Sequence, residues 1–319
     1  ECGGLVENVK VPKKHAFNSL RVALTKPLAS TPDMCFITPD LAFFDRPGLL
    51  HYALQGVFRF YNEKGSLPSN SEEDAKSVLD HAKAINEENK NTDGAWTIDE
   101  FSEEIFSKVS RYSQASISPV ASFFGGVVAQ EIVKFTGKYT PITQWLHLDF
   151  FTSLPKVEVN REPACTRYDD QILVFGREVQ EKMIKQKIFM VGAGALGCEL
   201  IKLFALMGVG CSPDGLVSCT DNDNIEISNL NRQFLFRSSD VGHSKSEAAC
   251  KKGTEMNSDF RVKSYQTLVG EQTEDIFNDK FWEGLNFVLK LKTLKNFFMS
   301  HLPPSCGRLS EFFLFSFDL

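Results

Sequence analysis

A glycine-rich segment in the second half of the chain, Gly-Ala-Gly-Ala-Leu-Gly at 192–197, has the residue types of a nucleotide-binding loop. It follows an apolar run at 188–191, typical of a buried strand, and precedes an apolar helical stretch at 198–207. The first two glycines let the backbone turn tightly and approach a ligand, and the third lets helix and strand pack closely. The helix start offers unpaired N–H groups and about half a positive charge to an anion. The residues expected at a nucleotide are Gly192, Gly194, Ala195 and Gly197.

Asp221 ends the next predicted strand, at 216–221, and its carboxylate is expected to accept hydrogen bonds from ribose hydroxyls. Strand, loop, helix, strand and acidic residue therefore occur in the order of a nucleotide-binding unit. This order predicts an α/β fold of the Rossmann type for the second half of the chain.

Two basic residues beyond this strand favour a triphosphate over a dinucleotide as the ligand. Arg232 and Lys245 supply the positive charges that a triphosphate requires, and Asn229 and Gln233 could add neutral hydrogen-bond donors. A dinucleotide instead presents its pyrophosphate to the helix start and needs little other charge nearby. The alternative interpretation is that these charges lie on a solvated helix face, which is the usual position of such residues.

The first half of the chain has the patterns of a small helical bundle. Apolar residues recur at helical spacing from about 45 to 112, and the sequence at 71–74 resembles a capping box at a helix start. A strongly apolar helix is predicted at 120–135, with Gly137 expected to end it. Residues 145–150 have the pattern of a short strand.

Residues 228–236, with the sequence Ser-Asn-Leu-Asn-Arg-Gln-Phe-Leu-Phe, follow the glycine loop and an Asp-x-Asp strand end. This block resembles the adenylation domain of ubiquitin-activating enzymes of the E1 type, in the ThiF/MoeB-like superfamily. Residues 167–171 resemble the start of that domain. The resemblance covers about residues 3–289, and its segments in the first half are 9–14, 44–47, 118–123, 125–131 and 144–146.

The resemblance implies an α/β fold with a partial, Rossmann-like adenylation domain of the ThiF/MoeB type. A helical bundle and the closing part of an inactive adenylation domain are expected to precede it. The implied domains are the end of a first catalytic-cysteine half-domain at 1–30, the bundle at 31–115, the closing part of the inactive adenylation domain at 116–160, the first part of the active adenylation domain at 161–289 and a divergent tail at 290–319.

The resemblance also implies a two-step reaction with ATP and Mg²⁺ as cofactors. The C-terminal carboxylate of ubiquitin, or of a close ubiquitin-like protein, attacks the α-phosphate of ATP and gives an acyl-adenylate and pyrophosphate. A cysteine in a later domain then takes the acyl group as a thioester and passes it to a ubiquitin-conjugating enzyme. The implied partners are therefore ubiquitin and, in the full-length protein, a ubiquitin-conjugating enzyme.

Residue roles follow from the matching positions. Arg232 and Lys245 are expected to stabilise phosphate charge during the reaction. Val269 is expected to contact the adenine, and His243 fits a solvated loop residue because adenylation needs no acid or base. The remaining residues expected to hold the nucleotide are Gly192, Gly194, Ala195, Gly197, Asp221, Asn229 and Gln233.

The similarity ends after Leu289, where the family continues with Asn-Ala-Leu-Asp-Asn and this chain has Lys-Leu-Lys-Thr-Leu at 290–294. The aspartate that helps to position Mg-ATP in the family is thus replaced near Thr293, so no protein ligand for the metal is expected. The favoured interpretation is a fragment with a non-native tail that lacks the acceptor cysteine and is inactive alone. The alternative is a spliced segment, because 292–297 distantly resembles the catalytic-cysteine motif with lysine in place of the cysteine.

Composition narrows the class of protein further. The net charge of −6 argues against a nucleic-acid partner, and no uninterrupted apolar run of ~18 residues predicts a membrane span. The eight cysteines are scattered without a Cys-x-x-Cys pair, which argues against a structural metal and favours the reducing cytoplasm and nucleus. Two other functions stay open: a non-catalytic module that binds ubiquitin or another partner, and an NAD-dependent oxidoreductase.

Overall fold

The computed structural model describes residues 14–27, 45–137, 139–291 and 315–316. These residues belong to two compact units, one drawn from 1–114 and 125–153 and the other from 115–124 and 154–319. Most of the predicted tail, including Thr293, lies outside the described residues, as do nearly all of the segment at 9–14 and Phe44.

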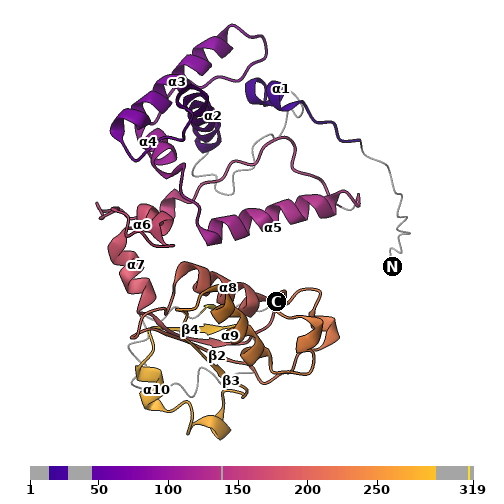
Figure 1. Ribbon diagram of the computed structural model, residues 1–319. Helices are drawn as coiled ribbons and strands as arrows, with labels where there is room; N and C mark the ends of the chain where they lie inside the picture. The colour runs from indigo at the N-terminus through magenta and orange to yellow at the C-terminus, as the bar shows by residue number, and fades with distance from the viewer. Residues whose placement is uncertain (1–13, 28–44, 138, 292–314, 317–319) are drawn as a thin grey trace, which may run out of the picture. The chain divides into compact units, whose positions relative to one another are not determined.

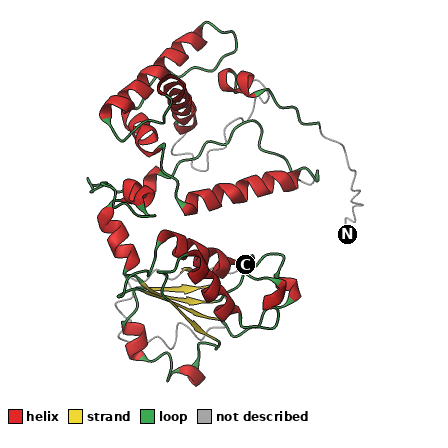
Figure 2. Ribbon diagram, viewed as in Figure 1, coloured by secondary structure: helices red, strands yellow, loops and turns green. Residues whose placement is uncertain are grey.

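The described part of the first unit contains helices and loops and no strand (Figure 2). Three of its helices enclose one apolar core, in which α3 buries Val78, Leu79 and Ala82 at helical spacing. Ser71 caps α3 as predicted, because its hydroxyl oxygen accepts a hydrogen bond from the Asp74 N–H at 3.1 Å. The helices that lie wholly in this unit are α1 (Leu20–Thr25), α2 (Arg46–Lys64), α3 (Glu72–Lys90) and α4 (Glu103–Tyr112).

Helix α5 (Ser118–Lys134) occupies the predicted apolar stretch, and Gly137 follows it with the left-handed φ of +79°. The next segment, 145–150, does not form the predicted strand. Its side chains instead bind the bundle of the first unit: the Trp145 indole N–H donates to the Ala23 carbonyl at 3.1 Å, and Asp149 pairs with Arg46 at 2.8 Å.

Two buried histidines make a further link within the first unit. His51 Nε2 lies 2.8 Å from the Leu24 carbonyl, and His51 Nδ1 lies 3.2 Å from His147 Nε2. Because a carbonyl only accepts hydrogen bonds, we assign the His51 proton to Nε2 and infer that His147 donates to His51 Nδ1. Burial lowers the pKa of His51, and burial together with the neighbouring His51 lowers the pKa of His147 to about 3.

The first unit is therefore expected to lose stability in mild acid. Below the ordinary pKa of 6.5 the unfolded chain protonates His147 and the folded chain does not. The free energy of unfolding should fall by about 1.4 kcal/mol per pH unit from this group, between about pH 6 and pH 3. Urea titrations at a series of pH values, followed by tryptophan fluorescence, measure this slope. His147→Gln should flatten it, and an equal slope in both proteins would contradict the assignment.

The second unit is built on a parallel sheet with the strand order β3-β2-β1-β4-β5 in the described residues. The side chains of β1 alternate between two cores: Ile188 and Met190 face one, and Phe189 and Val191 face the other. The strands are β1 (Lys187–Val191), β2 (Leu216–Thr220), β3 (Val262–Tyr265), β4 (Phe287–Lys290) and β5 (Phe315–Ser316).

Helices cover both faces of this sheet (Figure 1). Residues of α8 and α9 pack on the face of Met190, and α10 packs on the face of Phe189 through an aromatic cluster with Phe277 and Trp282. This is the doubly wound α/β arrangement that the sequence predicts. The helices of this unit are α6 (Asp169–Phe175), α7 (Arg177–Ile184), α8 (Ala195–Met207), α9 (Lys245–Met256) and α10 (Asp279–Glu283), with short 3-10 turns η3 (Ile227–Asn229), η4 (Ser238–Asp240) and η5 (Glu271–Thr273); the 3-10 turn η2 (Phe151–Ser153) lies in the first unit.

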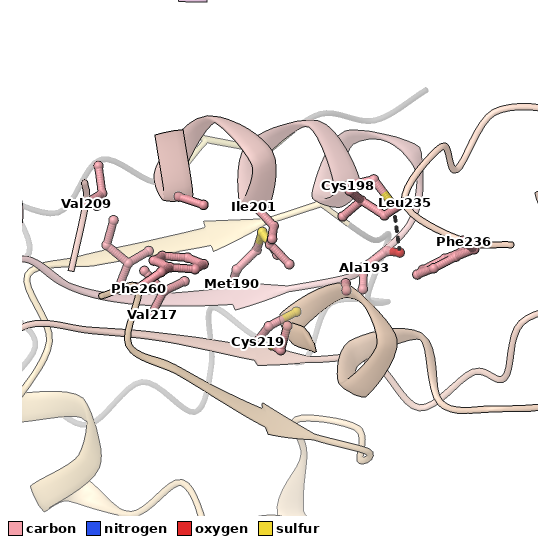
Figure 3. Packing of buried hydrophobic residues seen from close by; sticks show 14 of the residues in the cluster. Met190, Ala193, Cys198, Ile201, Val209, Val217, Cys219, Leu235, Phe236 and Phe260 are labelled. Atoms are coloured by element: carbon pink, nitrogen blue, oxygen red, sulfur yellow. Dashed lines mark hydrogen bonds between the residues drawn. The ribbon is translucent and has the colours of Figure 1, made fainter. Parts of the chain in front are cut away.

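The larger core contains three buried cysteines, Cys198, Cys219 and Cys250, which act as small apolar residues; Figure 3 labels the first two. Cys198 on α8 and Cys219 on β2 are fully buried, and burial raises the pKa of Cys198 to about 12. The Cys198 thiol donates to the Ala193 carbonyl at 3.9 Å, so it packs directly beneath the glycine loop.

Two further absences hold for the residues that the structure describes. No helix among them has the length and apolar character needed to cross a membrane. Within the same ranges, no three metal-binding side chains gather into a cluster that could hold an ion.

Candidate nucleotide-binding site

The glycine loop leaves the sheet where the order of the strands reverses. The chain passes from β1 through α8 to β2 on one side, and from β3 through α10 to β4 on the other side of β1. Connections that diverge in this way leave a crevice beyond the carboxyl ends of the strands, where α/β proteins bind ligands. The loop at 192–194 stands at that edge, because it directly follows Val191, the last residue of β1.

Each glycine of the loop has its own structural reason. Gly192 adopts a left-handed φ of +113°, which side chains disfavour. A Cβ on Gly197 would stand 2.4 Å from the Gly192 carbonyl oxygen, so close packing of loop and helix requires glycine there. At Gly194, by contrast, the nearest atom to an added Cβ is Gln233 Nε2 at 4.0 Å. The backbone angle at Gly192 and the close packing at Gly197 therefore shape the loop, whereas the space beside Gly194 is open.

Helix α8 begins at Ala195, after Gly194 as its N-cap residue, and no described side chain caps it. Its first N–H groups therefore point out of the helix start beside the open space at Gly194. Such an uncapped N-terminus attracts an anion through its N–H groups and the helix dipole.

Asp221 lies directly after β2 and is buried, with 5% of its surface exposed. Its Oδ2 accepts a hydrogen bond from the Ala193 N–H at 2.7 Å, and its Oδ1 accepts one from the Asp223 N–H at 3.0 Å. The predicted ribose acceptor is thus next to the glycine loop and bonded to it.

Lys245 is the first residue of α9 and is largely buried, with 8% of its surface exposed. Its ammonium lies 3.2 Å from Asp223 Oδ2, and its backbone N–H donates to the Asp223 carbonyl at 3.1 Å. The buried aliphatic stem and the Asp223 carboxylate together hold the Lys245 ammonium in one position.

The amide side chains of Asn229 and Gln233 differ in their surroundings. Asn229 Oδ1 accepts the Glu226 N–H at 3.0 Å, which closes the turn η3. Gln233 is 4% exposed, and its Oε1 is buried without a hydrogen-bond partner among the described residues. The atom of Gln233 nearest to Gly194 is the amide nitrogen Nε2, so this side chain presents a hydrogen-bond donor to the open space beside the loop.

Three predicted residues lie apart from these contacts. The Arg232 guanidinium is exposed and donates to the Ser228 carbonyl at 2.9 Å. His243 is exposed on its loop, in agreement with its interpretation as a solvated residue. Val269 follows β3 and packs against the aromatic cluster of α10.

The structure brings together the glycine loop, Asp221 and Gln233, and it links Lys245 to them through Asp223. The contacts of Asp223 and Ala193 were not predicted. The Asp-x-Asp sequence at the strand end, which puts a second carboxylate at 223, could have indicated the role of Asp223.

Two family models match the chain. Residues 168–293 match the ThiF family, and residues 11–86 match the four-helix bundle of ubiquitin-activating enzyme E1. The first range contains the glycine loop and every residue of the candidate site. The second begins in the N-terminal residues and ends within α3.

Curated relatives align with nearly the whole chain. Ubiquitin-activating enzyme E1 1 of Candida albicans (strain WO-1) is 43% identical over 299 residues, and human ubiquitin-like modifier-activating enzyme 1 is 42% identical over 293 residues. Ubiquitin-activating enzyme E1 2 of Arabidopsis thaliana is 42% identical over 296 residues. Each alignment covers 90% of this chain and only 26–28% of the relative, so the chain spans about a quarter of their length.

Two Escherichia coli structures are more distant in sequence. The tRNA N6-threonylcarbamoyladenosine dehydratase TcdA in complex with AMP gives a TM-score of 0.39 at 19% identity, covering 46% of this chain and 57% of that one. MccB with ATP gives a TM-score of 0.39 at 22% identity, covering 51% and 48%. The two family models and the alignments over 90% of its length show that this chain is similar to the ubiquitin-activating enzymes E1, through one segment that matches the ThiF family and an earlier one that matches the E1 four-helix bundle.

Proposed function

We propose that the second unit binds ATP for the adenylation of the C-terminus of ubiquitin or a close ubiquitin-like protein. The observation that carries the proposal is the convergence at one sheet edge of an uncapped helix start, a buried amide with its nitrogen toward Gly194, and a carboxylate bonded to the loop that leads to a positioned cation. A triphosphate needs both the helix start and a cation, whereas a pyrophosphate bridge between two nucleosides needs mainly the former.

In this proposal the nucleotide lies along the carboxyl edge of β1 and β2. Asp221 accepts from the ribose, Gln233 and Asn229 donate to the phosphates, and Val269 contacts the adenine. Lys245 neutralises phosphate charge as the α-phosphate becomes crowded. The residues proposed to line the phosphates through their backbone are Gly192, Gly194, Ala195 and Gly197.

Mg²⁺ is proposed to enter with the triphosphate. Magnesium retains several waters and is held through one or two carboxylates together with substrate phosphates, so it needs no full cage of protein ligands. The described residues fit this limited role, since the Asp221 carboxylate is bonded to the loop and to the backbone of Asp223, whose own carboxylate is partly exposed. When bound, Mg²⁺ would supply positive charge to the phosphate oxygens.

We also propose the domain boundaries along the chain and the reaction steps that follow adenylation. Thioester formation and transfer to a ubiquitin-conjugating enzyme are proposed for the longer proteins that contain this region. The proposed assignments are a first catalytic-cysteine half-domain ending at 1–30, a bundle at 31–115, an inactive adenylation domain closing at 116–160 and an active one beginning at 161–289.

Ubiquitin-dependent exchange of pyrophosphate into ATP tests this function. We expect this chain, in which the metal-side aspartate of the family is replaced near Thr293, to bind ATP and to show no sustained exchange. A relative of full length should show exchange that is lost when the lysine matching Lys245 is replaced. Exchange that survives this replacement in the relative would contradict the proposed role of the site, and robust exchange by the chain alone would contradict its expected inactivity.

Arg232 is proposed to turn toward the phosphates when ATP binds. Its side chain is exposed and held by a backbone carbonyl and the Asn231 side chain, so a new contact costs little rearrangement. Arg232→Ala should weaken ATP binding by about 5- to 10-fold, the effect of roughly 1–1.4 kcal/mol. Isothermal titration with ATP measures the change. Arg237→Ala is the matched control, because Arg237 is also exposed and bonded to backbone carbonyls. Equal affinities in the two variants would contradict a role for Arg232.

A further inference from the structure

The carboxylate of Asp221 is a structural component of the glycine loop. It is buried, and its Oδ2 accepts the Ala193 N–H at 2.7 Å, the shorter of its two backbone hydrogen bonds. One residue earlier in each segment, the Gly192 N–H donates to the Thr220 carbonyl at 2.8 Å. The end of β2 therefore holds two consecutive loop residues, 192 and 193, through one backbone and one side-chain acceptor.

The same carboxylate continues toward the lysine. Asp221 Oδ1 accepts the Asp223 N–H at 3.0 Å, and Asp223 then binds Lys245 twice, through its carbonyl and through its carboxylate. The hydrogen-bonded series Ala193, Asp221, Asp223 and Lys245 thus connects the loop before α8 with the first residue of α9. The loop and the start of α9 are the two elements proposed to bind phosphates. The hydrogen bonds that connect them lie within the protein and involve no ribose.

We propose that Asp221 is a positioning residue for the phosphate-binding elements, in addition to any contact with the ribose. It fixes the loop before the start of α8, and through Asp223 it positions Lys245 at the start of α9. This inference rests on the proposed ATP site and assigns part of its phosphate affinity to a carboxylate that touches no phosphate. A charged hydrogen bond to a buried N–H is strong enough to order a loop of this length.

A ligand without ribose separates the two roles. Asp221→Asn keeps the size of the side chain, and the full chain is titrated by calorimetry with ATP and with inorganic tripolyphosphate, both with Mg²⁺. Positioning predicts that tripolyphosphate binds about 5- to 10-fold more weakly to the variant, and that ATP, which also loses its ribose contact with Asp221, is weakened at least as much. A change of less than twofold for tripolyphosphate would overturn the proposal, whether ATP is weakened (contact with the ribose alone) or unaffected.

A control variant and the melting temperature of each variant show whether Asp221→Asn causes a general loss of structure. Asp240→Asn also replaces a carboxylate that accepts a backbone N–H, from Arg237 at 2.8 Å, but in a different turn, so it should leave tripolyphosphate affinity unchanged. Titrations are made well below the melting temperature of each variant. If the wild-type chain binds neither ligand, the proposed ATP site itself fails; if it binds both and Asp221→Asn changes only ATP, this inference alone fails.

A measurement on the unsubstituted chain covers the case in which Asp221→Asn does not fold. NMR should detect a scalar coupling across the hydrogen bond between the Ala193 amide nitrogen and the Asp221 carboxyl carbon in the absence of nucleotide. The hydrogen bond from the Gly192 N–H to the Thr220 carbonyl serves as an internal reference. Coupling for the reference but not for Ala193 and Asp221 would overturn the proposal.

Discussion

Replacing Gly197 with alanine is expected to destabilise the second unit by about 2 kcal/mol and to weaken ATP binding. The new Cβ would stand 2.4 Å from the Gly192 carbonyl oxygen and 3.2 Å from its carbonyl carbon, and neither backbone atom can rotate away. Overpacking of this kind costs about 1–3 kcal/mol, and the better helix propensity of alanine offsets at most about 1 kcal/mol of it. Thermal and urea unfolding measure the loss, and calorimetry measures ATP affinity.

Gly194→Ala is the matched control for this substitution. Its Cβ would meet no atom closer than Gln233 Nε2 at 4.0 Å, and Gly194 has a φ of −77°, which alanine accepts. This variant should keep the stability of the wild-type chain while its methyl group occupies space proposed for the nucleotide, so it should lose ATP affinity alone. If both alanines leave stability unchanged, the close approach of loop and helix is not as described.

Replacing Lys245 with methionine is expected to lower ATP affinity by about 10- to 100-fold with little change in stability. A hydrogen bond to a charged group contributes about 1.5–3 kcal/mol, and each 1.4 kcal/mol is tenfold in affinity. Methionine retains the buried stem of the side chain, while the Asp223 carboxylate that loses its ion pair is partly exposed and stays solvated. Calorimetric titration with ATP and thermal unfolding of the same preparations separate the two effects.

Lys252→Met provides the comparison within the same helix. Lys252 lies on α9 and pairs with Glu255 at 2.8 Å on the surface of the protein. It should bind ATP as the wild-type chain does. Equal ATP affinity in the Lys245 and Lys252 variants would show that the cation beside Asp223 does not face the phosphates.

Local patterns predicted the parts of the fold that depend on neighbours in the sequence. The order of strand, glycine loop, helix and strand correctly placed Gly192 directly after β1 and Asp221 directly after β2, and Gly197 lies in the first turn of α8. The capping residue Ser71 was likewise visible, because its partner Asp74 is three residues away. These features follow from turn geometry and short-range hydrogen bonds, so they can be predicted from residues close together in the sequence.

Contacts between distant residues were not predictable in this way. The segment 145–150 has the apolar pattern of a strand, but its contacts with Ala23, His51 and Arg46 fix it as a loop on the bundle. Those residues lie about 100 positions away in the sequence, so periodicity carries no information about them. The bond from Ala193 to Asp221 was missed for a similar reason, since it depends on how β1 and β2 align in the sheet.

Arg232 illustrates a further gap between residue type and position. Its charge suggested a phosphate contact, yet its guanidinium donates to the turn in which it lies. Residue type indicates what a ligand needs, but the rotamer of an exposed side chain is set by the nearest acceptors. The titration of Arg232→Ala is therefore the test of that assignment.

The central claim is that this sheet edge binds ATP through its phosphates, and parallel calorimetric titrations of the unsubstituted chain with Mg-ATP and with NAD⁺ test it most directly. The proposed site predicts saturable binding of Mg-ATP that inorganic tripolyphosphate displaces, and binding of NAD⁺ at least about tenfold weaker, because NAD⁺ lacks the triphosphate whose charge Lys245 would neutralise. Tight binding of NAD⁺ with no displacement by tripolyphosphate would contradict the account and favour a nicotinamide-dependent oxidoreductase.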